Sequence, residues 1–167
     1  MKNRLELPKL FAQKGFKRGV EVGTAQGRFA QIMLDTIPDL ELTCVDSYEG
    51  KWAVNYEIAK EALGDRVIKG HSTDVVNTIE AWSLDFVYID AAHDYDNVKA
   101  DIEAWAPKVK AGGIVAGDDY YLTRHGNLGV IKAVNEYCEK HLRRLHTTLW
   151  DLNAHEDDQQ PNWWFQK

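Results

Sequence analysis

Two kinds of hydrophobic pattern alternate along the chain. Short runs of β-branched and aromatic residues are typical of buried strands, and hydrophobic residues that recur every three or four positions are typical of amphipathic helices. The short runs predict strands at residues 18–22, 41–45, 67–70, 85–89, 113–117, 145–150 and 163–166. The periodic segments predict helices at residues 5–15, 27–36, 51–63, 73–82, 95–106 and 128–141. Because strands alternate with helices, the sheet is predicted to be mainly parallel.

The last two predicted strands, residues 145–150 and 163–166, follow each other without a helix. This arrangement predicts an antiparallel strand at that edge of the sheet. No linker or internal repeat divides the 167 residues, a length typical of one domain. The sequence therefore predicts a single α/β domain over residues 1–167, to which residues 1–17 contribute only a short N-terminal helix.

Charge and composition restrict the partners that we expect. The net charge of −6 and the scattered Lys and Arg residues argue against a nucleic-acid partner. No apolar run reaches transmembrane length, and the N-terminal residues lack the apolar core of a signal peptide. Cys44 and Cys138 fall within a predicted strand and a predicted helix, where we expect reduced, buried thiols. We therefore expect a cytoplasmic protein without a membrane or nucleic-acid partner.

The segment Val20–Ala30 combines a strand, a turn with two glycines and the start of a helix. Gly23 can take backbone angles that a side chain would forbid, and Gly27 would let the chain pass close to a ligand. The spacing is Glu-x-Gly-x-x-x-Gly, whereas dinucleotide-binding folds need Gly-x-Gly-x-x-Gly. The Glu21 carboxylate would repel a pyrophosphate and attract an ammonium group. The turn therefore favours a ligand that carries an ammonium group.

Polar residues follow each of the first five predicted strands. In a parallel sheet, ligands bind outside the carboxyl ends of the strands. The residues at these ends are Glu21, Asp46, Ser72, Asp90, Asp118 and Asp119. Asp46 lies 19 residues after Gly27, close to the offset at which an acidic residue binds ribose hydroxyls. Two alternatives stay open: Asp46 as the cap of a turn, and Ser72 as the N-cap of the helix that follows.

Asp90, Asp118 and Asp119 would converge at two adjacent strand ends. Their carboxylates would repel one another unless a cation lay between them. A set of ligands that are all oxygen atoms favours Mg²⁺, Mn²⁺ or Ca²⁺ over Zn²⁺. The alternative is that these residues are ordinary loop acids, some of which cap helices.

The segments Tyr88–His93 and Gly112–Tyr120, together with the turn after Glu21, resemble known sequence motifs. The turn resembles motif I of the class I S-adenosylmethionine-dependent methyltransferases. The two acidic segments resemble the metal-dependent O-methyltransferases of the catechol and antibiotic-sugar types, over a stretch from about Gly19 to Lys167. The Asp-Asp-Tyr sequence that ends the second segment is closer to the sugar type.

This resemblance implies a fold and a set of site residues. The fold is a Rossmann-like three-layer α/β/α sandwich, whose mainly parallel sheet has seven strands in the order 3-2-1-4-5-7-6 with an antiparallel edge strand. S-adenosylmethionine would be bound by Glu21, Gly23, Thr24, Gly27, Asp46, Ser47, Ser72 and Asp90. Mg²⁺, or another divalent cation, would be bound by Asp90, Asp118 and Asp119.

A hydroxyl group is a poor nucleophile for methyl transfer while it keeps its proton. A bound divalent cation lowers the pKa of a hydroxyl, and a nearby base can accept the proton. His93 follows Asp90 closely and is the candidate base, because imidazole exchanges protons near neutral pH. The catechol enzymes carry a lysine at this place, so this chain departs from their pattern. His93 and Asp90 are thus the catalytic candidates, and the alternative is that His93 is a loop residue bonded to Asp96 or to the backbone.

Two loops are candidates for the acceptor site. Tyr121, Arg124 and His125 follow the acidic pair. The acidic loop 151–158 would reach the same edge if the strand at 145–150 is parallel to the others. The alternative is that both loops are solvated surface.

The tryptophans are predicted to have different roles. Trp52 would cover the cofactor or the acceptor, or pack without contact to either. Trp82 and Trp105 lie on predicted helices and are expected in the core. Trp163 and Trp164 alternate on the last strand, so one should face the core and the other should face outward.

The predicted function is O-methylation of a hydroxyl group on a small molecule, a sugar or a phenol, with S-adenosylmethionine as the donor. Few residues precede the first strand, so the site is either open to a bulky acceptor or completed by a second copy in a homo-oligomer. One alternative is a same-fold relative of sugar or antibiotic hydroxylases, and another is a cofactor-binding domain without catalysis. A nucleotide-binding oxidoreductase would need the missing glycine fingerprint. An RNA or protein methyltransferase is disfavoured by the acidic charge and by the lack of an Asn-Pro-Pro-Tyr motif.

Overall fold

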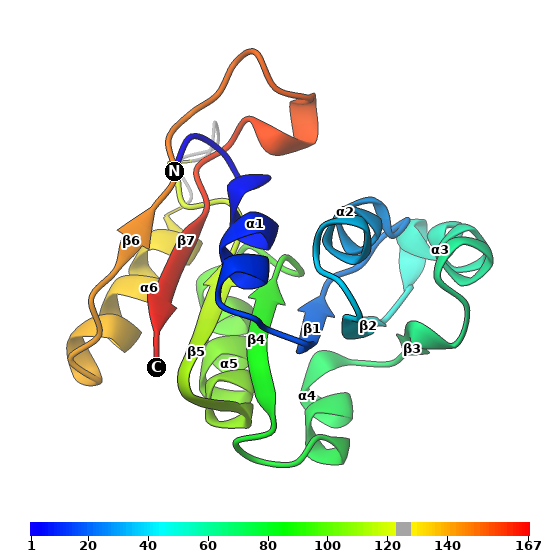
Figure 1. Ribbon diagram of the computed structural model, residues 1–167, viewed down its shortest axis with the longest axis horizontal. Helices are drawn as coiled ribbons and strands as arrows, with labels where there is room; N and C mark the ends of the chain where they lie inside the picture. The colour runs from blue at the N-terminus through cyan, green and yellow to red at the C-terminus, as the bar shows by residue number, and fades with distance from the viewer. Residues whose placement is uncertain (123–127) are drawn as a thin grey trace.

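A computed structural model describes residues 1–122 and 128–167, and its strands form one sheet in the order β3-β2-β1-β4-β5-β7-β6 (Figure 1). Strands β1 to β5 are parallel, and β7 is antiparallel to both β5 and β6. The strands are β1 (Arg18–Val22), β2 (Glu41–Asp46), β3 (Val67–Lys69), β4 (Leu84–Ile89), β5 (Val109–Gly117), β6 (His146–Thr147) and β7 (Trp163–Gln166). The predicted order and the antiparallel edge strand are confirmed.

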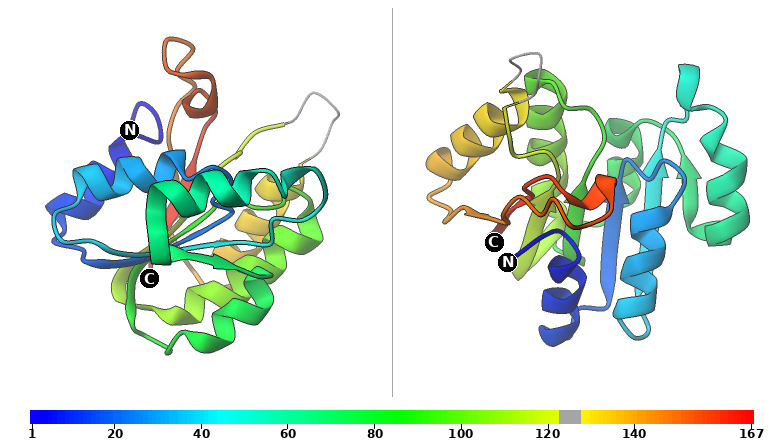
Figure 2. Two further views of the ribbon diagram at one scale, coloured as in Figure 1. Left: turned by 90° about the vertical axis from the view of Figure 1, so that its right-hand side faces the viewer. Right: turned by 90° about the horizontal axis from the view of Figure 1, so that it is seen from above.

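Helices cover both faces of the sheet, as Figure 2 shows. They are α1 (Glu6–Gln13), α2 (Arg28–Thr36), α3 (Asn55–Leu63), α4 (Ser72–Val75), α5 (Tyr95–Trp105) and α6 (Gly129–Lys140). The first three pack on one face and the last three on the other. The predicted three-layer α/β/α sandwich is therefore confirmed.

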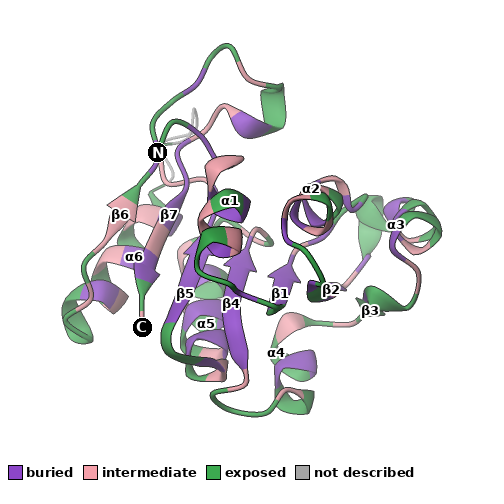
Figure 3. Ribbon diagram, in the orientation of Figure 1, coloured by how far each residue is buried: buried purple, intermediate pink, exposed green. Residues whose placement is uncertain are grey.

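Each face of the sheet has its own hydrophobic core. On one face, Phe11 of α1 stacks on Phe86 of β4, with ring centroids 4.3 Å apart. On the other face, Ile102 and Trp105 of α5 pack with Val134 of α6. The central strands are buried on both sides (Figure 3), which explains why they read as continuous apolar runs in the sequence.

Several element boundaries differ from the prediction. Strand β6 leaves the sheet after Thr147, because the next backbone N–H groups bond elsewhere: that of Thr148 to the Asn162 carbonyl and that of Leu149 to the Met1 carbonyl. Helix α4 ends at Val75, not at residue 82, and only a short 3₁₀ turn continues it. Its β-branched residues favour helix weakly. Strand β5 begins four residues earlier than predicted, at Val109.

The prediction for the tryptophans is confirmed at Trp105 and Trp163, is wrong at Trp82 and fits Trp164 only in part. Trp105 and Trp163 are fully buried, and Trp164 lies on the opposite face of the sheet from Trp163, half-buried against the other core instead of facing outward. Trp82 is not in the core: it is 62% exposed, in a turn beyond the early end of α4, with the Lys167 ammonium 4.2 Å from its ring centroid. Trp52 is also largely exposed.

The two cysteines, Cys44 and Cys138, are free and buried, as predicted. Within residues 1–122 and 128–167, no helix combines the length and the apolar character needed to cross a membrane.

Candidate active site

The carboxyl ends of the parallel strands bring most of the predicted site residues to one edge of the sheet. Glu21 comes from β1, Asp46 from β2, Asp90 from the end of β4 and Asp118 from the end of β5. The N-terminal segment 1–5 and the loop between β6 and β7 lie at the same end, beyond the arrowheads of β4 and β5 (Figure 1). This edge is the candidate active site.

The two glycines of the turn after β1 are explained by close contacts. A Cβ atom on Gly23 would lie 2.0 Å from the carbonyl oxygen of Asp90, and its φ of +91° already favours glycine. A Cβ atom on Gly27 would lie 2.6 Å from a methyl group of Leu63 in α3. Gly27 thus accommodates Leu63, and its predicted closeness to a ligand stays a prediction. Both glycines hold the turn tightly against the sheet and α3.

Glu21 and Thr24 carry buried polar atoms that the protein leaves without a partner of good geometry. These atoms are Oε2 of Glu21 and Oγ1 of Thr24. Burial raises the pKa of the Glu21 carboxyl group to about 8. A buried carboxylate oxygen without a donor is costly, so this position suits a ligand that brings a positively charged donor. The ammonium group predicted from the sequence would fit here.

Asp46 closes the loops around the end of β2. Its Oδ2 accepts a hydrogen bond from the Ala25 N–H at 2.9 Å, and its Oδ1 accepts one from the Tyr48 N–H at 2.9 Å. Both donors belong to residues with positive φ, 47° at Ala25 and 51° at Tyr48. Asp46 therefore acts as the turn cap that the sequence left as an alternative. Its role toward a ribose, and that of the adjacent half-buried Ser47, stay predictions.

Ser72 is the first residue of α4, and the N-cap position belongs to His71. The Ser72 hydroxyl donates a short hydrogen bond to the carboxylate of Asp101 in α5. Burial raises the pKa of Asp101. The N-cap alternative for Ser72 is therefore wrong by one residue, and contact with adenine stays a prediction.

Both oxygen atoms of the Asp118 carboxylate accept hydrogen bonds. Its Oδ1 accepts from Asn162 Nδ2 at 2.7 Å and from the Asp119 N–H at 2.8 Å, and its Oδ2 accepts from Arg4 Nη1 at 2.9 Å. The same Arg4 atom lies 3.2 Å from Asp90 Oδ2. Burial and the Asp90 carboxylate raise the pKa of Asp118, and the Arg4 guanidinium opposes this shift.

His93 lies between the carboxylates of Asp90 and Asp119. Its Nδ1 is 2.6 Å from Asp119 Oδ2, and its Nε2 is 3.6 Å from Asp90 Oδ1. The hydrogen bonds to Asp119 and Asp90 raise the pKa of His93 to about 10. His93 is therefore an imidazolium at neutral pH in this arrangement, and it must lose a proton before it can act as a base.

The predicted metal ligands do not fit a divalent cation in this arrangement. Asp90 and Asp118 share the Arg4 guanidinium, and Asp119 turns toward His93. Among the residues that the structure describes, no three acidic, His or Cys side chains are placed to hold a metal ion. The prediction of a Mg²⁺ site at Asp90, Asp118 and Asp119 thus requires a side-chain arrangement different from this one.

Sequence reasoning missed Arg4, Asn162 and Asp158 as site residues. Arg4 and Asn162 carried no local signal, because their positions depend on contacts with distant segments. Asp158 had a weak one, because it belongs to the acidic loop that was expected at this edge. Of the acceptor candidates, Tyr121 packs against the exposed Trp150, with ring centroids 5.1 Å apart, while Arg124 and His125 lie outside the described residues.

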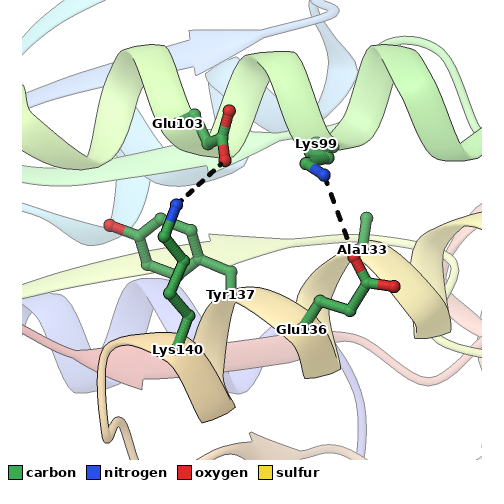
Figure 4. Close-up of a pocket in the computed structure, with 6 residues that line it drawn as sticks. All are labelled: Lys99, Glu103, Ala133, Glu136, Tyr137 and Lys140. Atoms are coloured by element: carbon green, nitrogen blue, oxygen red, sulfur yellow. Dashed lines mark ion pairs between the residues drawn. The ribbon is translucent and has the colours of Figure 1, made fainter.

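Two hollows lined by described residues differ in their surroundings. A cleft between α5 and α6 is lined by Lys99, Glu103, Ala133, Glu136, Tyr137 and Lys140 (Figure 4). Ion pairs cross this cleft, and none of the predicted site residues lines it. A smaller cavity at the strand ends is lined by Asp90, His93 and Asp118, with apolar walls that include Val98, Val130 and Trp163.

The sheet order, the glycine turn and the acidic strand ends together define the class I S-adenosylmethionine-dependent methyltransferase fold. A sequence profile described as a methyltransferase domain matches residues 20–120. Because the match covers more than half of the chain, the chain belongs to the methyltransferase family that this profile describes. It is also 29% identical, over 125 residues, to the uncharacterised protein y4gI of Sinorhizobium fredii; the match covers 66% of this chain and 14% of that protein. The chain thus spans only a small part of the length of this relative.

Several solved structures share the fold. An O-methyltransferase from Bacillus cereus, in complex with S-adenosylhomocysteine, superposes with a TM-score of 0.72 at 17% identity, over 98% of this chain and 80% of the other. The O-methyltransferase TomG from Streptomyces achromogenes, involved in tomaymycin synthesis and in complex with S-adenosylmethionine, gives 0.69 at 18% identity, over 97% and 78%. A methyltransferase dependent on S-adenosylmethionine from Archaeoglobus fulgidus gives 0.70 at 13% identity, over 97% and 91%.

Proposed function

We propose that this domain transfers the methyl group of S-adenosylmethionine to a hydroxyl group of a small molecule. The observation that carries the proposal is the buried, unpartnered Oε2 of Glu21 at the end of β1. The methionine part of the cofactor would bring an ammonium group to this atom. The O-methyltransferase neighbours in complex with S-adenosylmethionine or S-adenosylhomocysteine support the donor and the acceptor oxygen.

The residues proposed to bind the cofactor are those predicted from the sequence. Glu21 and Thr24 would contact the amino-acid part of the cofactor, because their buried atoms Oε2 and Oγ1 lack a hydrogen-bond partner of good geometry within the protein. Gly23 and Gly27 shape the turn above them. Asp46 and Ser47 would contact the ribose, Ser72 the adenine, and Asp90 the reacting end. S-adenosylmethionine, when bound, supplies an electrophilic methyl group on its sulfonium.

The proton of the acceptor hydroxyl would go to His93. Asp119 holds Nδ1 of His93, which leaves Nε2 directed toward Asp90. An acceptor hydroxyl within hydrogen-bond distance of Nε2 would donate its proton to a neutral His93, and the Asp90 carboxylate, 3.6 Å from Nε2, would stabilise the imidazolium that forms. No step through a divalent cation is proposed, because Arg4 and His93 already bind the oxygen atoms that it would need.

The first test is calorimetric titration of S-adenosylhomocysteine into the wild type and Glu21→Gln. We expect saturable binding by the wild type, and binding by Glu21→Gln that is at least about tenfold weaker, because the variant loses a charged hydrogen bond. The matched control is Glu41→Gln, which removes an exposed glutamate from the opposite end of the neighbouring strand. The proposal fails if the wild type does not bind, or if Glu21→Gln binds equally well. A screen of sugars and phenols with isotope-labelled S-adenosylmethionine then identifies the acceptor.

A further inference from the structure

The N-terminal segment 1–5 places a buried cation at the strand ends. The Arg4 side chain is only 6% exposed, and its guanidinium carbon lies 4.8 Å from the centroid of the Phe29 ring in α2. Burial works against its charge, but Tyr88 and the carboxylates of Asp118 and Asp90 hold the pKa of Arg4 above its ordinary value. Arg4 is therefore a permanent positive charge in a site otherwise dominated by acids.

The guanidinium joins three carboxylates from three different segments. Its Nη1 lies 2.9 Å from Asp118 Oδ2 and 3.2 Å from Asp90 Oδ2, and its Nε lies 2.7 Å from Asp158 Oδ1. The second oxygen of Asp158 accepts from Arg28. The Arg4 guanidinium would thus compete with a divalent cation, because both would need the same oxygen lone pairs of these carboxylates.

The segment that carries Arg4 is itself held in place. Asn3 Nδ2 donates to Asp151 Oδ2 at 2.7 Å, and the Lys2 ammonium lies 3.2 Å from the same atom. On the other side, α1 begins at Glu6 and buries Leu7 in the core. These contacts fix Arg4 from both directions, so its position is part of the architecture of the site.

We propose that Arg4 is the resident cation of this site. Its guanidinium keeps Asp90 and Asp118 together in the way that a divalent ion would, so the domain binds its cofactor and acts without such an ion. The claim that the domain binds its cofactor and acts without a divalent ion rests on the proposed function. The claim that Arg4 keeps the carboxylates together concerns only side chains of this chain. If Arg4 were absent, the carboxylates of Asp90, Asp118 and Asp158 would form an anionic cluster able to bind a divalent cation.

The test compares Mn²⁺ binding by the wild type and Arg4→Met, measured from the electron paramagnetic resonance signal of free Mn²⁺. Methionine keeps the apolar stem against Phe29 and removes the charge. We expect Arg4→Met to bind one Mn²⁺ with an affinity on the order of a hundredfold above that of the wild type, because no guanidinium has to be displaced. Mn²⁺ should also raise the melting temperature of Arg4→Met and leave that of the wild type unchanged.

Two further variants identify the site. Arg28→Met removes a cation from Asp158 but leaves Arg4 in place, so it should not gain Mn²⁺ binding. Arg4→Met combined with Asp118→Asn should lose the gained binding. If Arg4→Met does not fold by circular dichroism, Arg4→Gln takes its place, because its amide nitrogen corresponds to Nε of Arg4, which donates to Asp158.

Several results would overturn the proposal. One is saturable Mn²⁺ binding by the wild type that disappears in Asp118→Asn, and another is a folded Arg4 variant that does not bind Mn²⁺. A third is loss of S-adenosylhomocysteine binding when the wild type is treated with EDTA. If S-adenosylhomocysteine binds neither with Mg²⁺ nor with EDTA, the proposed function fails instead, and the Mn²⁺ results still decide the role of Arg4.

Discussion

Glu21 and Asp118 are both buried carboxyl groups at strand ends, and they differ in their partners. Asp118 has donors at both oxygens, whereas Oε2 of Glu21 has none of good geometry. A buried carboxyl group without a donor avoids the cost of its charge by holding a proton. The two residues therefore differ in role: the hydrogen bonds of Asp118 are made within the protein, whereas Oε2 of Glu21 is available for a hydrogen bond from a ligand.

Cofactor binding is expected to release a proton from Glu21. With a pKa of about 8 in the free protein, Glu21 is mostly protonated at pH 7, and an ammonium ligand requires the carboxylate. Binding at pH 7 should release about 0.9 proton, and affinity should rise with pH until about pH 8 and then level off. Titration of S-adenosylhomocysteine in buffers of different ionisation enthalpy measures the released proton. Glu21→Gln should release none; binding by the wild type without proton release would contradict the assignment.

Methyl transfer is expected to accelerate as His93 loses its proton. Because the pKa of His93 is about 10, the rate under subsaturating acceptor should rise about tenfold per pH unit and level off near pH 10. The pH–rate profile of His93→Gln should be flat and low. His141→Gln, a change at the end of α6, serves as the control and should keep the wild-type profile. A wild-type rate that is independent of pH from 6 to 9 would exclude His93 as the base.

At the scale of elements, the sequence predicts those site residues that lie at the ends of strands. Glu21, Asp90 and Asp118 come together because parallel strands end at a common edge, and the periodicity locates those ends. Arg4 could not be predicted, because the path of its segment depends on Asp151 and Asp158, far away in the chain. The early end of α4 also has no strong sequence signal beyond a few β-branched residues.

The turn between β1 and α2 gives a test at this scale. Gly23→Ala should destabilise the domain by at least about 3 kcal/mol, because the new methyl group would overlap the Asp90 carbonyl in addition to the strain at positive φ. Gly15→Ala is the control: its φ is +70° but no atom lies within 4 Å of the added Cβ, so about 1 kcal/mol is expected. Urea unfolding measures both. Equal losses would show that the contact with Asp90 is unimportant.

At the scale of the whole molecule, the site joins segments from both halves of the chain. Asp158, in the loop before β7, binds Arg4 of the N-terminal segment and Arg28 of α2. Burial opposes its charge, but the hydrogen bonds from Arg28 and Arg4 prevail, so the pKa of Asp158 is lowered. Asp158 therefore connects three regions that the sheet alone does not hold together.

Asp158→Asn should destabilise the domain by about 3 kcal/mol at pH 7, because the buried Arg4 loses one of its three carboxylate partners and Arg28 loses its closest one. The control Asp157→Asn removes a half-exposed carboxylate 3.8 Å from Arg28 and should cost less than about 1 kcal/mol. A carboxyl group with a lowered pKa stabilises the folded state above its unfolded pKa. The difference between wild type and Asp158→Asn should thus shrink below about pH 4. Urea unfolding at pH 7 and pH 3 checks both statements, and a pH-independent difference would contradict them.

The contact between Arg4 and Asp158 has a consequence for the order of folding. The two residues are separated by 154 positions, and closing so long a loop is entropically expensive until the sheet has shortened the distance. The five parallel strands can pair before this contact forms, but the acidic strand ends remain uncompensated until both segments arrive. We expect the active site to be the last part of the molecule to mature during refolding, so that cofactor affinity appears after the secondary structure is complete.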